Sequence, residues 1–238
     1  MTRLTRFVRS MSRRARARRA LLFRSQFVLD ENTRVLDLGS EDGSHIHAVL
    51  AGTAVRPENV YIADIAAEAQ ALARGQERYG YRPVPIDETG RLPFEDGFFD
   101  VVHCSSVIEH VTVPKAQVWA LRSGAEFRRL STLRQREFAV EVMRVGRQFF
   151  VQTPHRGFPV ESHSWLPFFG YLPRRVLVPL LGLTNRFWIK RTAPDWRLLT
   201  GGELSRLFDG AEILREDFLG LTKSVVAVRV ERSPARRD

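Results

Sequence analysis

The stretch RVLDLGSEDG, residues 34–43, decides the fold of this chain. Its apolar run is typical of a buried strand, and Gly39 ends that run in a turn. Residues 44–50 then carry apolar side chains at helical spacing. A glycine turn between a strand and a helix lets a cofactor approach the backbone, beside the free N–H groups of the helix N-terminus. On its own, this turn is only a weak indication of nucleotide-like binding.

Strands and helices alternate beyond this turn. By the same patterns we expect strands at 59–62, 81–86, 98–104 and 148–152, and helical regions at 65–79 and 115–146. Two final strands, 211–216 and 224–230, are expected to close the sheet as an antiparallel hairpin. The alternation predicts an α/β fold in which a mostly parallel sheet carries helices on both faces.

Asp64 follows the second expected strand, 21 residues beyond Gly43. An acidic residue at this place can accept hydrogen bonds from both hydroxyls of a ribose. It can also cap the N-terminus of the helix expected at 65–79. The two roles are compatible, so Asp64 strengthens the prediction of a nucleotide-like cofactor.

The chain divides into three parts by composition, and the second part contains an insertion. Its 238 residues, 44% of them apolar, suit one α/β domain with a modest insertion. We expect a basic helical arm at 1–30, a main domain at 31–230 and a polar tail at 231–238. Within the main domain, the segment 153–199 is rich in proline and aromatic residues and is expected to form an insertion on the substrate side of the site.

Positive charge is concentrated in the arm. The chain has a formal net charge of +10, and residues 1–24 hold nine arginines and no acidic residue. The remaining chain has 28 basic and 27 acidic residues, so its body is nearly neutral. Such an arm can contact a polyanion, which can be nucleic acid, an anionic membrane surface or the acidic face of a protein, or it can be a solvated terminus.

Cys104 is the single cysteine, so no intrachain disulfide can form and a reducing compartment is favoured. The apolar run 20–23 is too short for a signal peptide, and no apolar stretch approaches the ~20 residues of a spanning helix. We therefore expect a cytoplasmic protein without a transmembrane segment. Peripheral contact with an anionic membrane through the arm is an alternative.

Two linked motifs indicate the type of cofactor. Residues 92–102 read LPFEDGFFDVV, and residues 105–111 read SSVIEHV. Together with the first turn, they resemble the S-adenosyl-L-methionine (SAM)-binding methyltransferases of the large type 11 group of class I enzymes. The resemblance covers roughly residues 34–152. It implies a Rossmann-like, seven-stranded, mostly parallel sheet whose last strand is antiparallel.

The resemblance also implies a cofactor site at the ends of the first four strands. Its expected members are Asp37, Gly39, Ser40, Gly43, Asp64, Ile65, Asp87, Glu88, Ser105 and Ser106. The first turn would frame the methionine end of SAM, and Asp64 would hold the ribose. Ile65 would contact the adenine, and either Asp87 or Glu88 would meet the adenine amino group.

Glu41 departs from the family pattern, which has a glycine at the middle of the first turn. A side chain there can crowd SAM, although its negative charge favours the ammonium or sulfonium group. The sequence therefore leaves the affinity for SAM open at this position.

Three histidines are expected at the carboxyl edge of the sheet, where α/β sites form: His110, His155 and His163. Residues 152–163, QTPHRGFPVESH, look like a bacterial subgroup of these methyltransferases with a TPNR-then-FPxExH pattern. Methyl transfer needs in-line alignment, and it needs a base only when the acceptor must lose a proton. Glu109 and Glu161 lie beside these histidines in the sequence, but no metal-binding spacing is present, so no metal is expected.

The aromatic-rich part of the insertion, 165–189, allows three interpretations. It can cover a pocket for a lipid-like or aromatic acceptor, lie on an anionic membrane with the arm, or form a small core of its own.

These features predict a SAM-dependent methyltransferase that acts on a small-molecule, glycan or lipid-precursor acceptor, at oxygen. The first alternative is an RNA methyltransferase that uses the arginine arm for phosphates. The Asn/Asp-Pro-Pro-aromatic motif of nucleic-acid methyltransferases does not occur, which places this alternative lower. The second alternative is a non-catalytic scaffold with this fold, for which Glu41 is the main argument.

Overall fold

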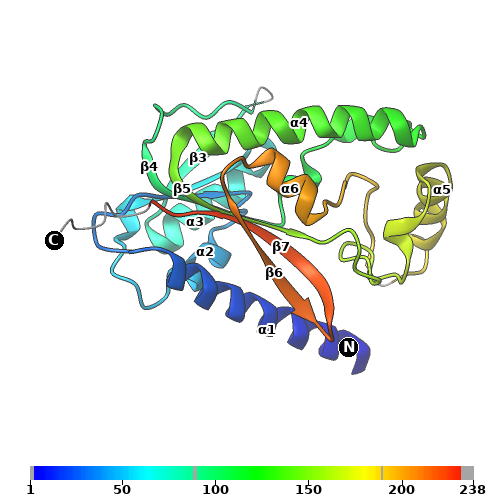
Figure 1. Cartoon of the computed structure of the whole chain (residues 1–238), viewed down its shortest axis with the longest axis horizontal. Coiled ribbons are helices and arrows are strands. Elements are labelled where there is room, and N and C mark those ends of the chain that lie inside the picture. Colours follow the sequence, from blue (N-terminus) through cyan, green and yellow to red (C-terminus); the bar gives the residue numbers. More distant parts are fainter. Residues whose placement is uncertain (1–2, 88–89, 189, 232–238) are drawn as a thin grey trace. The chain divides into compact units, whose positions relative to one another are not determined.

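The computed structural model describes residues 3–87, 90–188 and 190–231, with side chains from residue 13 onward. Its helices and strands (Figure 1) are α1 (Arg3–Gln26), β1 (Val35–Leu38), α2 (Ser44–Leu50), β2 (Val60–Ile65), α3 (Ala69–Tyr79), β3 (Arg82–Ile86), β4 (Phe99–Ser105), α4 (Gly124–Val145), β5 (Gly146–Pro154), α5 (Arg174–Thr184), α6 (Gly201–Leu207), β6 (Glu212–Phe218) and β7 (Leu221–Arg229). The strands form one sheet in the order β3-β2-β1-β4-β5-β7-β6.

The sheet confirms the predicted fold class. β1 pairs in parallel with β2, and β2 with β3, whereas β7 runs antiparallel to both β5 and β6. The expected hairpin of the last two strands is therefore present. A parallel sheet with one antiparallel strand at this place is the Rossmann-like arrangement that the linked motifs imply.

Local boundaries differ from the expectation in two places. The helix expected at 65–79 begins only at Ala69, because a short 3₁₀ turn precedes it, and Asp64 lies within β2. The helical region expected at 115–146 is interrupted before Gly124, where α4 begins.

The chain forms two compact units. The first unit comprises Met1–His103, Val145–Gln148 and Val230–Asp238, and the second comprises Cys104–Arg144 and Phe149–Arg229. Within the first unit, α3 packs on β2 and β3, and α1 packs on α2. Phe23 and Phe27 are buried, and the Arg24 guanidinium donates to the Val49 carbonyl at 2.8 Å. The end of the basic arm is thus part of the core of this unit.

The second unit contains the insertion, with a small apolar core of its own. Leu177 and Leu181 of α5 pack with Trp196 and Leu198, which follow later in the insertion. In the same unit α6 packs on β6 and β7 (Figure 1). Among the helices of the described ranges, none combines the length and apolarity needed to cross a bilayer.

Candidate active site

The turn after β1 requires left-handed backbone at every second residue. Gly39 has φ 71°, Glu41 has φ 50° and Gly43 has φ 72°. This alternation explains why the family pattern places glycine at all three positions, because side chains with a Cβ are strained in this region. Glu41 adopts the left-handed conformation without being a glycine, so the turn keeps the shape that the pattern predicts.

Asp64 ties the end of β2 to this turn. One of its carboxylate oxygens accepts the backbone N–H of Glu41 at 3.0 Å, and the other accepts the N–H of Ile65 at 2.8 Å. Each carboxylate oxygen has a second lone pair, so the side chain can still accept two hydroxyl groups. The residue is partly exposed. Its geometry therefore fits the expected ribose site.

Asp37 is buried beneath the turn. The resemblance places it at the methionine end of SAM, whereas in the structure its carboxylate contacts two side chains of the protein. His103 Nδ1 and Ser40 Oγ each lie 2.5 Å from one of its two carboxylate oxygens. The side chain is almost inaccessible, with 2% of the residue surface exposed. Asp37 thus orients the turn through Ser40.

The other expected cofactor residues lie in both units. In the first unit, Ile65 is 40% exposed at the end of β2. Asp87 is exposed directly after β3, whose Ile86 is in register with Ile65. Glu88 lies outside the described residues. In the second unit, Ser105 is the last residue of β4, and Ser106 follows it.

Gln152 of β5 holds the two serines in place. Its side-chain oxygen accepts Ser105 Oγ–H at 2.8 Å and Ser106 Oγ–H at 3.1 Å, and its carbonyl accepts the Ser106 N–H at 3.0 Å. Ser106 has a φ of 61°, so the chain turns sharply there. These contacts set the course of the segment that leads to Glu109 and His110.

Two of the three expected histidines meet in the second unit. The rings of His110 and His163 are perpendicular, with centroids 4.6 Å apart. Three carboxylates surround them, and together these five residues form the His–carboxylate cluster: Glu109, His110, Glu161, His163 and Asp195. His163 Nδ1 lies 2.6 Å from Glu161 Oε1, and His110 Nδ1 lies 3.4 Å from Asp195 Oδ1.

The opposite charges of this cluster shift the pKa values of His163 and Glu161. Burial alone would lower the pKa of His163, but the carboxylates of Glu109 and Glu161 outweigh it and raise that pKa to about 9. Burial likewise opposes the charge of Glu161, yet its contacts with His163 lower the pKa of its carboxyl. His163 is therefore positively charged at neutral pH in this structure, and it balances two buried carboxylates.

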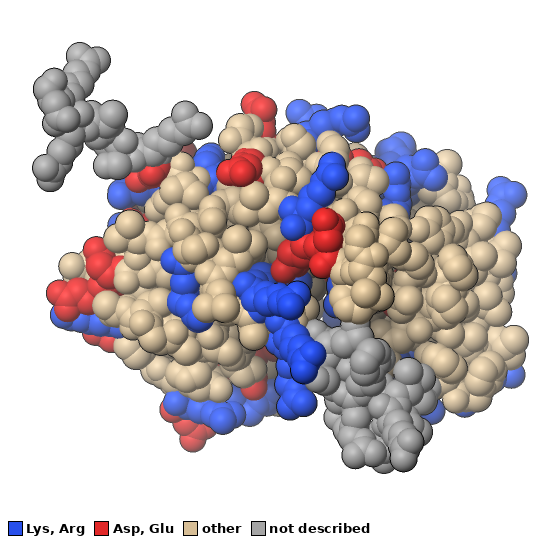
Figure 2. Space-filling model, turned by 60° about the horizontal axis from the view of Figure 1, so that its bottom comes forward, with Lys and Arg blue, Asp and Glu red and all other residues tan. Residues whose placement is uncertain are grey.

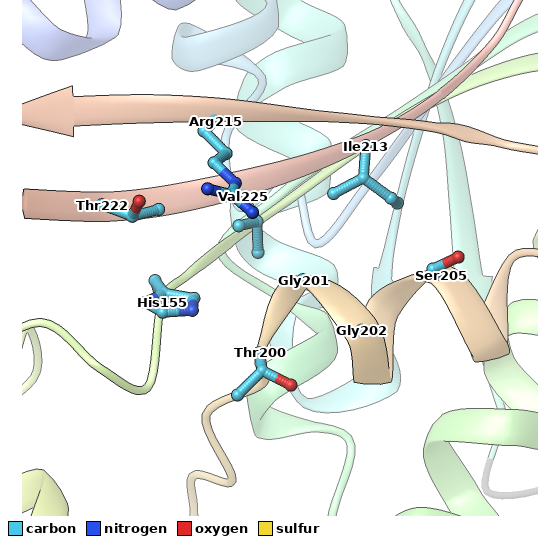
Figure 3. A pocket seen from close by; sticks show the side chains of 9 residues that line it. All are labelled: His155, Thr200, Gly201, Gly202, Ser205, Ile213, Arg215, Thr222 and Val225. Atoms are coloured by element: carbon cyan, nitrogen blue, oxygen red, sulfur yellow. The ribbon is translucent and has the colours of Figure 1, made fainter.

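His155 lies in a separate cavity of the second unit, of about 510 Å³. Arg215 and Thr222 line it from β6 and β7, and the start of α6 lines it from the other side (Figure 3). Burial, followed by the nearby Arg215 and Arg156, lowers the pKa of His155. The structure thus brings together only two of the three expected histidines.

Sequence reasoning missed Asp195, Gln152 and His103. Asp195 lies in the irregular part of the insertion, where no pattern precedes it. Gln152 is a polar residue near the end of β5, after the apolar run 149–151. His103 is a polar residue inside the apolar run of β4, and this break in the run is the one signal that could have drawn attention to it.

Comparisons with known proteins agree with this architecture. A family model described as a methyltransferase domain matches residues 7–172, which is more than half of the chain. A comparison with curated proteins found no match.

Two solved structures with TM-scores above 0.5 share the fold at low sequence identity. A candidate methyltransferase of Haloferax volcanii, solved with the Trm112 methyltransferase activator, has a TM-score of 0.52 at 14% identity, covering 89% of this chain and 86% of that one. A candidate O-methyltransferase from Nostoc punctiforme has a TM-score of 0.54 at 13% identity, covering 91% and 56%. A SAM-dependent methyltransferase from Aquifex aeolicus has a TM-score of 0.47 at 13% identity, covering 88% of each chain.

Proposed function

The chain belongs to the methyltransferase domain family, and from that premise we propose that it methylates an oxygen atom of a small-molecule, glycan or lipid-precursor acceptor. It is a SAM-dependent methyltransferase, as its linked motifs imply.

We assign SAM to the carboxyl ends of β1, β2 and β3 in the first unit. The left-handed turn at 39–43 allows close approach to the backbone, and Asp64 retains lone pairs for two ribose hydroxyls. Ile65 and Asp87 are exposed at the ends of β2 and β3, where we place the adenine. When bound, SAM supplies an electrophilic methyl group on a positively charged sulfur.

The His–carboxylate cluster carries the proposal of an oxygen acceptor. It presents the partly exposed His110 beside buried carboxylates, so a hydroxyl group can both donate and accept hydrogen bonds there. Oriented polar groups of this kind align an acceptor oxygen for in-line displacement. We therefore propose that His110 and His163 bind the acceptor, and that His155 belongs to a different cavity.

Exposed apolar side chains of the insertion favour a lipid-like acceptor within this class. Phe168 is 64% exposed and Phe187 70% exposed, and Tyr171, Val176 and Leu183 are exposed as well. Such a surface can receive the hydrocarbon part of a lipid precursor or rest on a membrane surface. The arginine arm would add attraction to anionic groups.

The distribution of charge favours a small-molecule, glycan or lipid-precursor acceptor over RNA. On the face drawn in Figure 2, Lys and Arg side chains are accompanied by Asp and Glu side chains. Outside residues 1–24 the basic and acidic residues nearly balance, so phosphate contacts would depend mainly on the arm.

The acceptor class can be tested by methyl transfer from ¹³C-methyl SAM to separate fractions of a bacterial extract. We expect label in the small-molecule, glycan or lipid fraction, with a carbon chemical shift typical of methyl bound to oxygen. Label in RNA, together with RNA retention that falls steeply with salt, would instead support the arm-dependent alternative.

His110→Ala is expected to lower kcat/KM for the labelled acceptor by about 10–100-fold, because an oriented hydrogen bond is lost. Binding of SAM, measured by calorimetry, should stay within about twofold. His155→Ala is the matched control, because it removes an imidazole ring from the same unit but outside the His–carboxylate cluster. If His155→Ala lowers kcat/KM more than His110→Ala does, the acceptor binds in the cavity that His155 lines.

Glu41→Gly is expected to raise the affinity for SAM and the melting temperature together. Glycine accepts φ 50° without strain, which relieves about 1 kcal/mol, and it removes a side chain from the turn. Calorimetry should show SAM binding tightened several-fold. Unchanged or weaker binding would mean that the Glu41 carboxylate attracts the cation, as its charge also allows.

A further inference from the structure

Glu109, His110 and His163 come close enough to share one ion. One ligand atom from each of the three side chains lies within 4.8 Å of the other two. Glu109 and His110 come from the 3₁₀ turn after β4, and His163 comes from the insertion after β5. Two distant segments of the second unit therefore converge on a single point.

Both histidines carry the outer contacts that metal-binding histidines usually have. Glu161 lies 2.6 Å from Nδ1 of His163, and Asp195 lies 3.4 Å from Nδ1 of His110. Carboxylates in this place fix the ring orientation, and Nε2 can bind a metal ion after its proton has been released. Glu161 is itself held by the backbone N–H groups of His163 and Ser164.

Glu109 adds an independent indication. The residue has no exposed surface, and its Oε2 accepts Thr153 Oγ–H at 2.9 Å. Its Oε1 is buried and has no hydrogen-bond partner among the residues that the structure describes. His163 Nε2 is 3.8 Å from this atom, which is too long for a hydrogen bond. The charge of His163 offsets that of Glu109 at this distance, but the buried oxygen still has no hydrogen bond, so it can become a ligand of a metal ion once His163 has lost its proton.

We propose that the second unit binds a divalent transition-metal ion, such as Zn²⁺, through Glu109, His110 and His163. Two imidazoles and one carboxylate suit Zn²⁺ and similar ions, whereas Mg²⁺ prefers oxygen ligands. The sequence shows no metal-binding spacing because the third ligand lies 53 positions after the second.

Three protein ligands leave at least one coordination position open to water or another oxygen ligand. In tetrahedral Zn²⁺ sites, ligand atoms lie about 3.4 Å from one another, given bonds of about 2.1 Å. The three side chains must therefore draw closer on binding. His110 can supply this movement, because 36% of its side-chain surface is exposed. This inference concerns the ion alone and does not depend on the identity of the acceptor.

Calorimetric titration of the chelator-treated full chain with ZnCl₂, without SAM or acceptor, tests the site. We expect one ion per chain at micromolar or tighter affinity, no competition by Mg²⁺, and Co²⁺ absorption bands of a nitrogen–oxygen ligand set. His110→Asn should weaken binding at least tenfold, and Glu109→Gln should do the same. Asp195→Asn should weaken it about 10–100-fold through His110.

Two control variants remove an imidazole and a carboxylate at positions outside the proposed metal site. His47→Asn in α2 and Glu126→Gln in α4 are exposed and should bind Zn²⁺ as the wild type does. Because His110 is partly exposed, His110→Asn should keep its melting temperature even if a Glu109 variant fails to fold. Absence of Zn²⁺ binding, or binding that His110→Asn leaves unchanged, would overturn the proposal. The titration contains neither SAM nor acceptor, so it can fail while the proposed methyl transfer, which is measured separately, still holds.

Discussion

Replacing Asp64 by alanine is expected to abolish SAM binding at concentrations that saturate the wild type. Two hydrogen bonds from ribose hydroxyls to a charged acceptor contribute about 1.5–3 kcal/mol each, so the affinity should fall at least about 100-fold. The variant also loses the anchor of the turn at the N–H of Glu41, which adds to the effect. Calorimetry with SAM measures the loss directly.

Asp30→Ala separates the cofactor role from local stability. Asp30 likewise accepts hydrogen bonds from its own loop, from the Asn32 N–H and the Thr33 hydroxyl, but it precedes β1. The Asp30→Ala substitution should lower the melting temperature by a few degrees and leave the affinity for SAM unchanged. If Asp64→Ala binds SAM as tightly as Asp30→Ala does, Asp64 only supports the turn and the ribose lies elsewhere.

Gly75→Ala is expected to destabilise the first unit and weaken SAM binding, although alanine is the better helix former. A Cβ at position 75 of α3 would lie 2.6 Å from Ile62 Cδ1 and 2.8 Å from the backbone oxygen of Asp42. The side chain of Ile62 can move, but the Asp42 carbonyl belongs to the turn at 39–43. Overpacking of this kind costs about 1–3 kcal/mol, or roughly 2–12 °C in melting temperature.

Gly202→Ala in α6 is the matched control, because nothing lies within 4 Å of the Cβ that it would add. There the ordinary helix preference should act alone and raise stability by about 0.5–1 kcal/mol. Thermal unfolding of both variants, with and without SAM, gives the comparison. Equal stabilisation by the two substitutions would show that α3 does not press on the cofactor turn.

The sequence determined the features that depend on neighbouring residues. Periodicity in the apolar side chains places strands and helices within a few residues, and the turn at 39–43 is readable because left-handed backbone favours glycine. The linked motifs at 92–111 then identified the SAM-dependent class. Asp64 was predicted as a ribose ligand from its position at a strand end, and in the structure it accepts the Glu41 N–H of the turn.

Other features were decided only by the tertiary structure, because they join residues that are far apart in the chain. Asp37 pairs with His103, 66 positions away, and so orients the turn from below. In the sequence, Gly75 is only a residue of low helix propensity. The structure shows that a Cβ at this position would clash with the Asp42 carbonyl.

The His–carboxylate cluster shows the same limit most clearly. Its members come from a 3₁₀ turn, a loop and the irregular end of the insertion, and none of these segments has a periodic pattern. A side chain in such a segment can point in any direction until packing sets the backbone. Burial then leaves Glu109 Oε1 facing His163 and separates His155 from the other two histidines. The sequence determined which polar groups are present, and long-range packing decided which of them meet.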